Sequence, residues 1–250
     1  MKILSIGNSF SQDAHKWLHQ VAESAGENIL AVNLYIGGCS LSTHWECFLN
    51  KTASYDYEVN GVFERKISLN DALYADTWDV ITLQQVSQLS GDYATFEPYL
   101  TDLYKKAKEA SPKARIYLHK TWAYEMDSEH PGFLKYGKSQ SDMYKKIGEA
   151  YEAAGKKLGC GIIPVGDVIQ YLRDNTEYFD YKNGGESLNR DGFHLSYVYG
   201  RYAAAVTWLS YLCGTDPESV FFVPEGEGFK TDTDVLKIIN QAVKKIREAI

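Results

Sequence analysis

The chain has 250 residues, and its 26 Lys and Arg against 33 Asp and Glu give a formal net charge of −7. With 44% hydrophobic and 24% charged residues, the composition is typical of a folded globular domain and excludes disorder, collagen and a coiled coil as the main description. The acidic balance also argues against a nucleic-acid partner, because such a protein needs a basic face to neutralise phosphates.

The sequence carries no sign of a membrane or secretory segment. No apolar run approaches the roughly 20 residues needed to cross a bilayer, so we expect no membrane partner. The start of the chain has one cation and too short an apolar stretch for a signal peptide. This predicts a cytoplasmic protein, unless a signal peptide was removed. The four cysteines form no Cys-x-x-Cys pair, so we expect reduced thiols and no zinc site.

The first part of the chain alternates apolar runs with helical patterns. Residues 2–6 form an apolar run that Gly7 ends, which predicts a strand. Apolar positions at helical spacing follow and predict a helix that Gly26 terminates. Residues 29–36 predict a second strand, and a brief helix is expected around Trp45.

A β-hairpin is predicted next, where Asn60-Gly61 separates residues 55–60 from residues 62–67. The remaining predicted elements, in chain order, are a strand at 78–83, a helix around 99–107, a strand at 115–119, a long loop at 121–137, a helix at 143–158, a strand at 161–165 and helices at 168–172, 197–212 and 235–246. Strands that alternate with helices predict a parallel sheet with right-handed crossovers. The expected fold class is α/β: a single domain over residues 1–250, with three layers (α/β/α) around a five-stranded parallel sheet and the hairpin, at about 55–67, as an insertion.

Ligands of an open α/β sheet bind beyond the carboxyl ends of its strands, so the residues just after each strand are the candidates for a site. Ser9 follows the first strand on a strand-to-helix turn, which suits a nucleophile beside free N–H groups, although a helix cap also explains it. Gly37-Gly38 follows the second strand and permits either a close backbone approach to a ligand or a tight turn. Gln84 and Gln85 follow the third strand and offer amide donors.

Asp191 and His194 lie three residues apart, ahead of a late apolar helix. This spacing lets the carboxylate meet Nδ1 of the imidazole, which fixes the tautomer and leaves Nε2 as a base. A helix cap beside a surface histidine is the structural alternative. The pair is the most specific of the candidate segments and favours catalysis.

Taken together, these motifs resemble the SGNH hydrolases, also called GDSL-like esterases and lipases. Gly7-Asn8-Ser9-Phe10-Ser11 is similar to the first block of that family, with Asn8 in place of the usual aspartate. Gly38 lies where the glycine block of the family belongs. In the third block a glutamine replaces the asparagine of the family, and the register leaves Gln84 or Gln85 as the donor, with Gln84 favoured.

The resemblance implies a flavodoxin-like SGNH hydrolase fold and a serine esterase that hydrolyses small acyl esters. Acetyl groups on a carbohydrate are the expected substrate. Ser9 is then the nucleophile, His194 the general base and Asp191 the partner of the base. The oxyanion hole combines the N–H groups of Ser9 and Gly38 with the glutamine amide, and the reaction needs no metal or cofactor.

Three further residues are expected to contact the substrate: His44 after the glycine turn, and Trp122 and Tyr124 in the long loop. The 19 Tyr against 10 Phe also suit a sugar-binding surface. Two other functions stay open. A catalytically weak carbohydrate-binding protein on the same fold is motivated by the altered third block, and a nucleotide or FMN binder by the flavodoxin-like architecture. The sequence leaves the oligomeric state open.

Overall fold

The central sheet is mixed, and its strand order is β4-β3-β2-β1-β5-β6-β7. The computed structural model describes residues 1–225 and 229–249. Its strands are β1 (Lys2–Gly7), β2 (Leu30–Tyr35), β3 (Tyr55–Val59), β4 (Val62–Ile67), β5 (Val80–Leu83), β6 (Arg115–His119) and β7 (Gly161–Ile163). The five core strands predicted from the sequence are parallel neighbours in the order β2-β1-β5-β6-β7, which is the flavodoxin-like order.

The number of strands in the sheet is a correction to the prediction, since the hairpin joins the sheet and brings it to seven strands. Strand β3 pairs antiparallel with β2, and β4 forms the edge. A bare edge at β2 would leave a row of backbone N–H and C=O groups unpaired, and β3 satisfies them. Asn60 and Gly61 have φ angles of 50° and 78°, as a two-residue hairpin turn requires.

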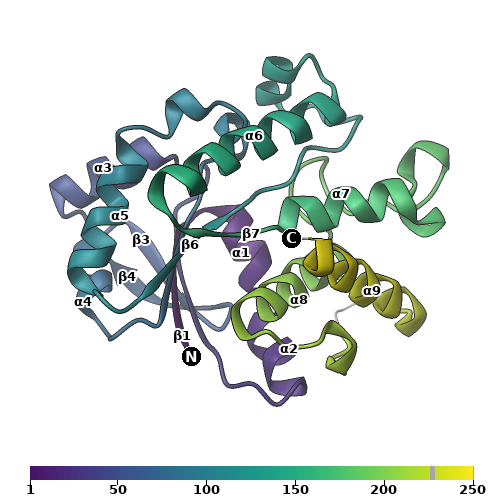
Figure 1. Cartoon of the computed structure of the whole chain (residues 1–250), viewed down its shortest axis with the longest axis horizontal. Coiled ribbons are helices and arrows are strands. Elements are labelled where there is room, and N and C mark those ends of the chain that lie inside the picture. Colours follow the sequence, from purple (N-terminus) through teal and green to yellow (C-terminus); the bar gives the residue numbers. More distant parts are fainter. Residues whose placement is uncertain (226–228, 250) are drawn as a thin grey trace.

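Helices cover both faces of the sheet and make three layers (Figure 1). The helices are α1 (Ser9–His15), α2 (Leu18–Ser24), α3 (Leu41–Asn50), α4 (Leu69–Tyr74), α5 (Tyr99–Ala110), α6 (Gln140–Leu158), α7 (Val165–Asn175), α8 (Tyr199–Cys213) and α9 (Thr233–Ala249). One layer holds α1, α2, α7, α8 and α9, and the other holds α3, α4, α5 and α6. Helix α1 packs against β1, β2 and α8, which fixes the element that carries Ser9.

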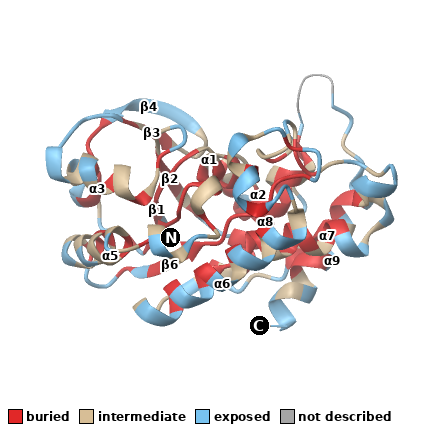
Figure 2. Cartoon of the chain, turned by 90° about the horizontal axis from the view of Figure 1, so that it is seen from above, coloured by how far each residue is buried: buried red, intermediate tan, exposed pale blue. Residues whose placement is uncertain are grey.

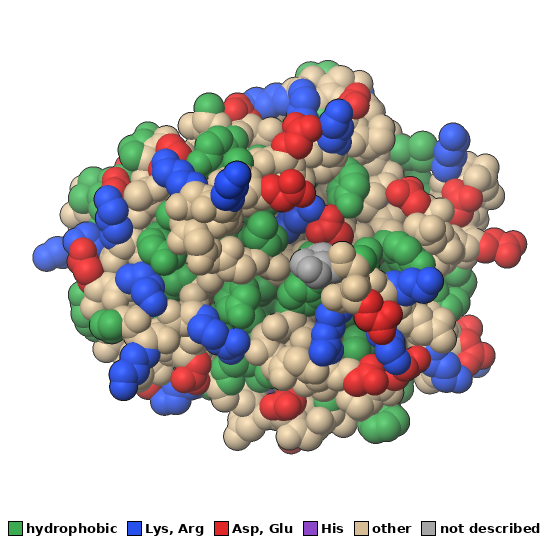
Figure 3. Space-filling view, in the orientation of Figure 1, with side chains coloured by type: hydrophobic (Ala, Val, Ile, Leu, Met, Phe, Trp, Pro, Cys, Tyr) green, Lys and Arg blue, Asp and Glu red, His purple; other side chains and the backbone are tan. Residues whose placement is uncertain are grey.

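The core runs along both faces of the sheet, and α8 is its most enclosed helix (Figure 2). Trp78, Trp122 and Trp208 are fully buried, whereas most of edge strand β4 is exposed. The face shown in Figure 3 carries acidic and basic side chains interspersed with apolar ones. Across the described ranges, every helix is too short or too polar to span a membrane.

Candidate active site

Three predicted site segments meet at one edge of the sheet because the strands that precede them are parallel neighbours. Strand β1 lies between β2 and β5, with Gly7 opposite Tyr35 and Ile6 opposite Leu83. The turns that follow these strands therefore lie side by side at their carboxyl ends, where open α/β sheets bind ligands. The structure thus brings together the Ser9, Gly38 and glutamine segments.

Ser9 is the first residue of α1 and is partly exposed. Asn8 caps this helix: its backbone is extended (φ −143°), and its side-chain Oδ1 accepts the N–H of Phe10 at 3.0 Å. The cap starts the helix directly after β1, so the Ser9 hydroxyl projects at the end of the strand. Asn8 is therefore the helix cap, and the hydroxyl of Ser9 takes no part in capping.

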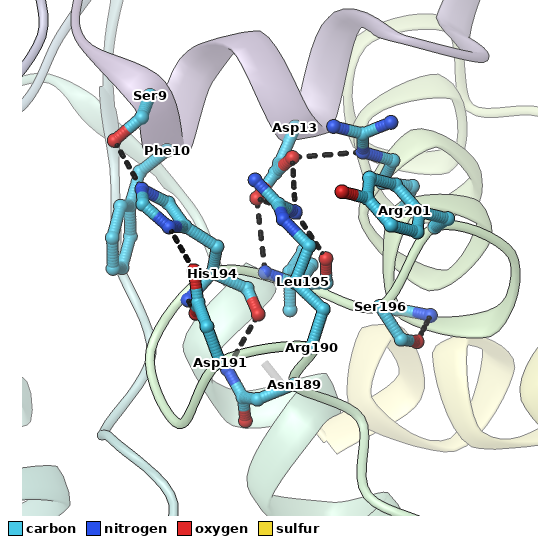
Figure 4. A network of polar contacts seen from close by, with 12 residues as sticks. Ser9, Phe10, Asp13, Asn189, Arg190, Asp191, His194, Leu195, Ser196 and Arg201 are labelled. Atoms are coloured by element: carbon cyan, nitrogen blue, oxygen red, sulfur yellow. Dashed lines mark hydrogen bonds and ion pairs between the residues drawn. The ribbon is translucent and has the colours of Figure 1, made fainter. Parts of the chain in front are cut away.

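Ser9, His194 and Asp191 form a hydrogen-bonded line (Figure 4). The Ser9 Oγ is 2.8 Å from Nε2 of His194, and Nδ1 of His194 is 2.7 Å from Oδ2 of Asp191. The other carboxylate oxygen of Asp191 accepts the backbone N–H groups of His194 (2.8 Å) and Phe193 (3.2 Å). This geometry suits an imidazole that takes a proton from the serine while the carboxylate supports it.

Asp191 is about two-fifths exposed, and its environment keeps it ionised. Partial burial opposes ionisation, but hydrogen bonds from the His194 ring and from the N–H groups of His194 and Phe193 outweigh burial. Together they hold the pKa of the Asp191 carboxyl below its usual value. A charged Asp191 is the form that stabilises an imidazolium at His194.

The segment that carries His194 is a loop and not the head of a helix as the sequence suggested. Helix α8 begins only at Tyr199, so Asp191 does not cap it. We call residues 189–195 the His194 loop: a bridge between Asn189 and Leu195 closes it, and the N–H of Arg190 donates to the His194 carbonyl at 3.0 Å. The pairing of the two ends presents His194 to Ser9.

The structure distinguishes the two glutamines that the sequence left open. Both are buried. The Gln85 Oε1 accepts the N–H groups of Leu41 (3.0 Å) and Val86 (2.8 Å), while its Nε2 donates to the carbonyl (3.0 Å) and hydroxyl (3.1 Å) of Thr95. Its amide is thus occupied in tying α3 to the loop after β5. Gln84 instead faces Asn8, with its Nε2 2.7 Å from the Asn8 Oδ1.

The orientation of the Gln84 amide follows from a chain of donors and acceptors. Asn8 Oδ1 accepts the N–H of Phe10, so the Gln84 atom beside it is the NH2 group and the opposite atom is Oε1. That oxygen accepts from Nδ1 of His119 at 2.8 Å. Burial lowers the pKa of His119 to about 3, so the ring is neutral and carries its proton on Nδ1. His119, the last residue of β6, therefore fixes the amide of Gln84.

Asn8 links all three candidate oxyanion donors. It precedes Ser9, it accepts from Gln84, and its Nδ2 donates at 3.0 Å to the carbonyl of Cys39, the residue after Gly38. Gly38 has a φ of 64°, which suits glycine. Within residues 1–225 and 229–249, the N–H groups of Ser9 and Gly38 donate no hydrogen bond. Asn8 thus contacts the Gln84 amide and the residue that follows Gly38, and it directly precedes Ser9.

The structure corrects the three predicted substrate contacts, because His44, Trp122 and Tyr124 are fully buried. Nδ1 of His44 lies 2.8 Å from the hydroxyl of Tyr55, and the Tyr124 hydroxyl lies 2.7 Å from that of Ser87. Large aromatic rings stabilise a protein most when they are buried, and these side chains pack in the core instead of lining a cleft. None of the three contacts substrate in this conformation.

Trp122 instead packs against residues next to Ser9 and His194. Its ring stacks on Phe10, with centroids 4.1 Å apart, and its Nε1 donates to the carbonyl of Phe193 at 2.8 Å. The sequence reasoning missed Phe193 and His130, which are partly exposed beside His194. The Phe193 ring lies 4.1 Å from that of His194 and 4.8 Å from that of His130. Phe193 lies inside the Asp-x-x-His block, which is the signal that could have found it.

In the described part of the chain, no group of three or more His, Cys, Asp or Glu side chains is placed to hold a metal ion. The line from hydroxyl to imidazole to carboxylate through Ser9, His194 and Asp191 is continuous. The arrangement can activate a hydroxyl and hold a developing negative charge with N–H donors.

Comparisons with known proteins identify the family and the fold of the chain. The family model described as "Domain of unknown function (DUF4886)" matches residues 2–240. A crystal structure of a DUF4886 family protein from Bacteroides uniformis is 34% identical, with a TM-score of 0.90, and the match covers 98% of this chain and 93% of that one. No curated protein matches the sequence at a significant level.

More distant structures share the fold. A protein from Slackia heliotrinireducens, described as a candidate SGNH hydrolase, is 24% identical with a TM-score of 0.57, over 83% of this chain and 96% of that one. A variant of an acetyl-xylooligosaccharide esterase from Geobacillus stearmophilus is 13% identical with a TM-score of 0.53, over 90% and 97%. These likenesses establish the α/β fold with its helix-flanked, mostly parallel sheet as the SGNH hydrolase fold.

Proposed function

Because this chain belongs to the DUF4886 family and has the fold of the SGNH hydrolases, we propose that it is a serine esterase that removes small acyl groups, chiefly acetyl groups, from carbohydrates. The observation that carries the proposal is the line of hydrogen bonds from Ser9 through His194 to Asp191. Such a line converts a hydroxyl of ordinary reactivity into a nucleophile.

In the first half of the reaction, the Ser9 Oγ attacks the carbonyl carbon of the ester and its proton passes to Nε2 of His194. The negative charge that develops on the carbonyl oxygen is held by the N–H groups of Ser9 and Gly38 and by the Gln84 amide. Asp191 stabilises the imidazolium through Nδ1. The tetrahedral intermediate then collapses, His194 protonates the alcohol oxygen as it leaves, and the acyl group stays on Ser9.

In the second half, water replaces the alcohol. His194 removes a proton from the water, whose oxygen attacks the acyl carbon, and the same donors hold the second oxyanion. His194 then returns the proton to the Ser9 Oγ as the ester bond breaks. The carboxylic acid leaves, and the free hydroxyl of Ser9 is restored.

A polar cavity supports a carbohydrate as the alcohol part of the substrate. It has a volume of about 330 Å³, and it adjoins Asp191 and Gly192. Its lining offers mainly carboxylate, hydroxyl and amide groups, from Glu125, Asp127, Ser128, Glu129, Tyr181, Ser187, Asn189, Arg190 and Asp191. Carboxylate oxygens accept hydrogen bonds from sugar hydroxyls, whereas a long acyl chain would need an apolar groove.

The test is covalent labelling of the active serine together with hydrolysis of p-nitrophenyl acetate and of acetylated oligosaccharides. We expect a fluorophosphonate to modify Ser9, and Ser9→Ala to abolish both labelling and hydrolysis. Ser11→Ala is the matched control: this hydroxyl, on the same helix, is buried and bonded to the Asn8 carbonyl (2.8 Å) and to Asn33 (2.7 Å).

Full esterase activity in Ser9→Ala would show that Ser9 is not the nucleophile. Glycan binding by the wild-type protein, without acyl transfer to Ser9 from any ester, would favour the alternative of a carbohydrate-binding protein on this fold.

A further inference from the structure

Asp13 is a fully buried carboxylate one helical turn beyond Ser9 on α1. It accepts hydrogen bonds from three groups (Figure 4): Nη1 of Arg190 at 2.9 and 3.1 Å, Nε of Arg201 at 2.8 Å and the backbone N–H of Leu195 at 2.9 Å. Two positive charges and one backbone donor thus surround one negative charge. A buried carboxylate without such partners would be costly, so these contacts are strongly held.

Two of the three partners belong to the His194 loop and lie on either side of His194. Arg190 precedes His194 by four residues, and Leu195 follows it directly. Arg190 also donates from Nη1 to the Leu195 carbonyl, which joins the two sides of the loop. The third partner, Arg201, comes from α8 and holds the carboxylate of Asp13 from the other side.

The helix that begins with Ser9 therefore also anchors the loop that carries His194. We propose that Asp13 is a positioning residue of the active site: by binding Arg190 and Leu195, it sets the 2.8 Å separation between the Ser9 Oγ and Nε2 of His194. The proposal rests on the esterase function argued above. Because proton transfer demands hydrogen-bond reach, a displacement of about 1 Å lowers the rate about a hundredfold.

The test compares two carboxylates that form ion pairs, the fully buried Asp13 and the partly buried Asp167. Asp13→Asn removes the charge that holds Arg190. Asp167→Asn is the matched control, since Asp167 forms an ion pair with Lys120 (2.6 Å) and accepts from Tyr144 (2.8 Å), and all three lie outside the His194 loop. The readouts are the rate of fluorophosphonate labelling of Ser9, kcat and KM for p-nitrophenyl acetate, and hydrogen exchange of the Leu195 amide.

For Asp13→Asn we expect labelling and kcat to fall about a hundredfold with KM little changed, and the Leu195 amide to exchange faster. Asp167→Asn should label at the wild-type rate even though it also loses an ion pair. A folded Asp13→Asn protein that labels Ser9 at the wild-type rate would overturn the proposal. A purely stabilising role would lower the unfolding midpoint of both variants and leave labelling unchanged in both.

A second pair of variants keeps the proposal testable if Asp13→Asn does not fold. Arg190→Gln and Arg201→Gln each take one arginine from Asp13, but only Arg190 lies in the His194 loop. We expect labelling of Ser9 to slow at least tenfold more in Arg190→Gln, and equal rates would overturn the proposal.

The two proposals fail in different ways. Wild-type protein that neither labels nor hydrolyses esters refutes the esterase. The Leu195 amide then decides whether Asp13 holds the loop: faster exchange in Asp13→Asn supports the contact, and unchanged protection refutes it.

Discussion

Substitution of Gln84 by alanine should lower activity, whereas substitution of its neighbour Gln85 should lower stability. Nε2 of Gln84 donates to Asn8, beside the start of α1. The amide of Gln85 instead forms hydrogen bonds with Leu41, Val86 and Thr95. Gln84→Ala should therefore impair the proposed oxyanion hole. Gln85→Ala should impair stability and leave the chemistry intact.

The expected magnitudes follow from what each amide contacts. Loss of one oxyanion donor lowers kcat roughly a hundred- to a thousandfold, which corresponds to about 3 to 4 kcal/mol of transition-state stabilisation. Gln85→Ala instead leaves the backbone N–H groups of Leu41 and Val86 without their acceptor in a buried region. Each unsatisfied group costs about 1 to 3 kcal/mol, so the free energy of unfolding should fall by about 2 to 6 kcal/mol.

Two measurements on each variant separate these effects: steady-state hydrolysis of p-nitrophenyl acetate, and urea unfolding monitored by tryptophan fluorescence. The hydrolysis assay is run well below the unfolding midpoint of each variant, so that kcat reports on folded protein. The reasoning would be refuted if Gln84→Ala kept the wild-type kcat. It would also be refuted if Gln85→Ala lost as much kcat as Gln84→Ala.

Two further predictions concern charge. Asp191→Asn should lower kcat about ten-thousandfold, because the amide supports the wrong imidazole tautomer, and a rate within tenfold of wild type would limit Asp191 to a structural role. Burial lowers the pKa values of His15, His44 and His119 to about 3. Between about pH 6.5 and pH 3 the unfolded chain therefore binds more protons than the folded chain. As the pH is lowered through this range, the free energy of unfolding decreases by ~1.4 kcal/mol per pH unit for each ring. In urea unfolding from about pH 6 to about pH 4.5, His44→Gln should flatten this slope by roughly a third, whereas Tyr55→Phe, which removes the same hydrogen bond but keeps the imidazole, should not; equal slopes in the two variants would contradict the reasoning.

The sequence was sufficient for features that depend on local patterns. Short apolar runs predicted the five core strands, and Asn60-Gly61 predicted the hairpin turn, because each signal lies within a few residues. The site segments followed from the rule that ligands bind beyond parallel strand ends. The hairpin's place in the sheet was missed, since pairing with β2 depends on a partner about 25 residues away.

The choice between Gln84 and Gln85 shows a different limit. Gln84 and Gln85 follow directly after β5, which ends at Leu83, and successive side chains of an extended chain point to opposite sides, so the two glutamines are expected to point in different directions. The sequence fixes that alternation but not its phase relative to Asn8. Burial is a second limit. Aromatic loop residues such as Trp122 and Tyr124 look the same in sequence whether they line a cleft or fill the core beneath it.

The contacts of Asp13 could have been predicted only in part from the sequence. Residues four apart share one face of a helix, so an acid at position 13 is expected beside Ser9. Arg190, next to Asp191, was equally visible. That they meet depends on the return of the chain after α7, which no local pattern encodes.

The two departures from the family pattern, Asn8 and Gln84, are physically one feature. Asn8 accepts from Gln84 through Oδ1 and donates to the Cys39 carbonyl through Nδ2. An aspartate at position 8 could accept the first bond, but a carboxylate has no proton to donate, so the turn that carries Gly38 would lose its tie. A side chain one methylene longer than asparagine reaches Asn8 from the end of β5, where His119 holds it by Oε1. The Asn8 side chain therefore orients the Gln84 amide and also fixes the turn that carries Gly38, and an aspartate at position 8 could do only the first.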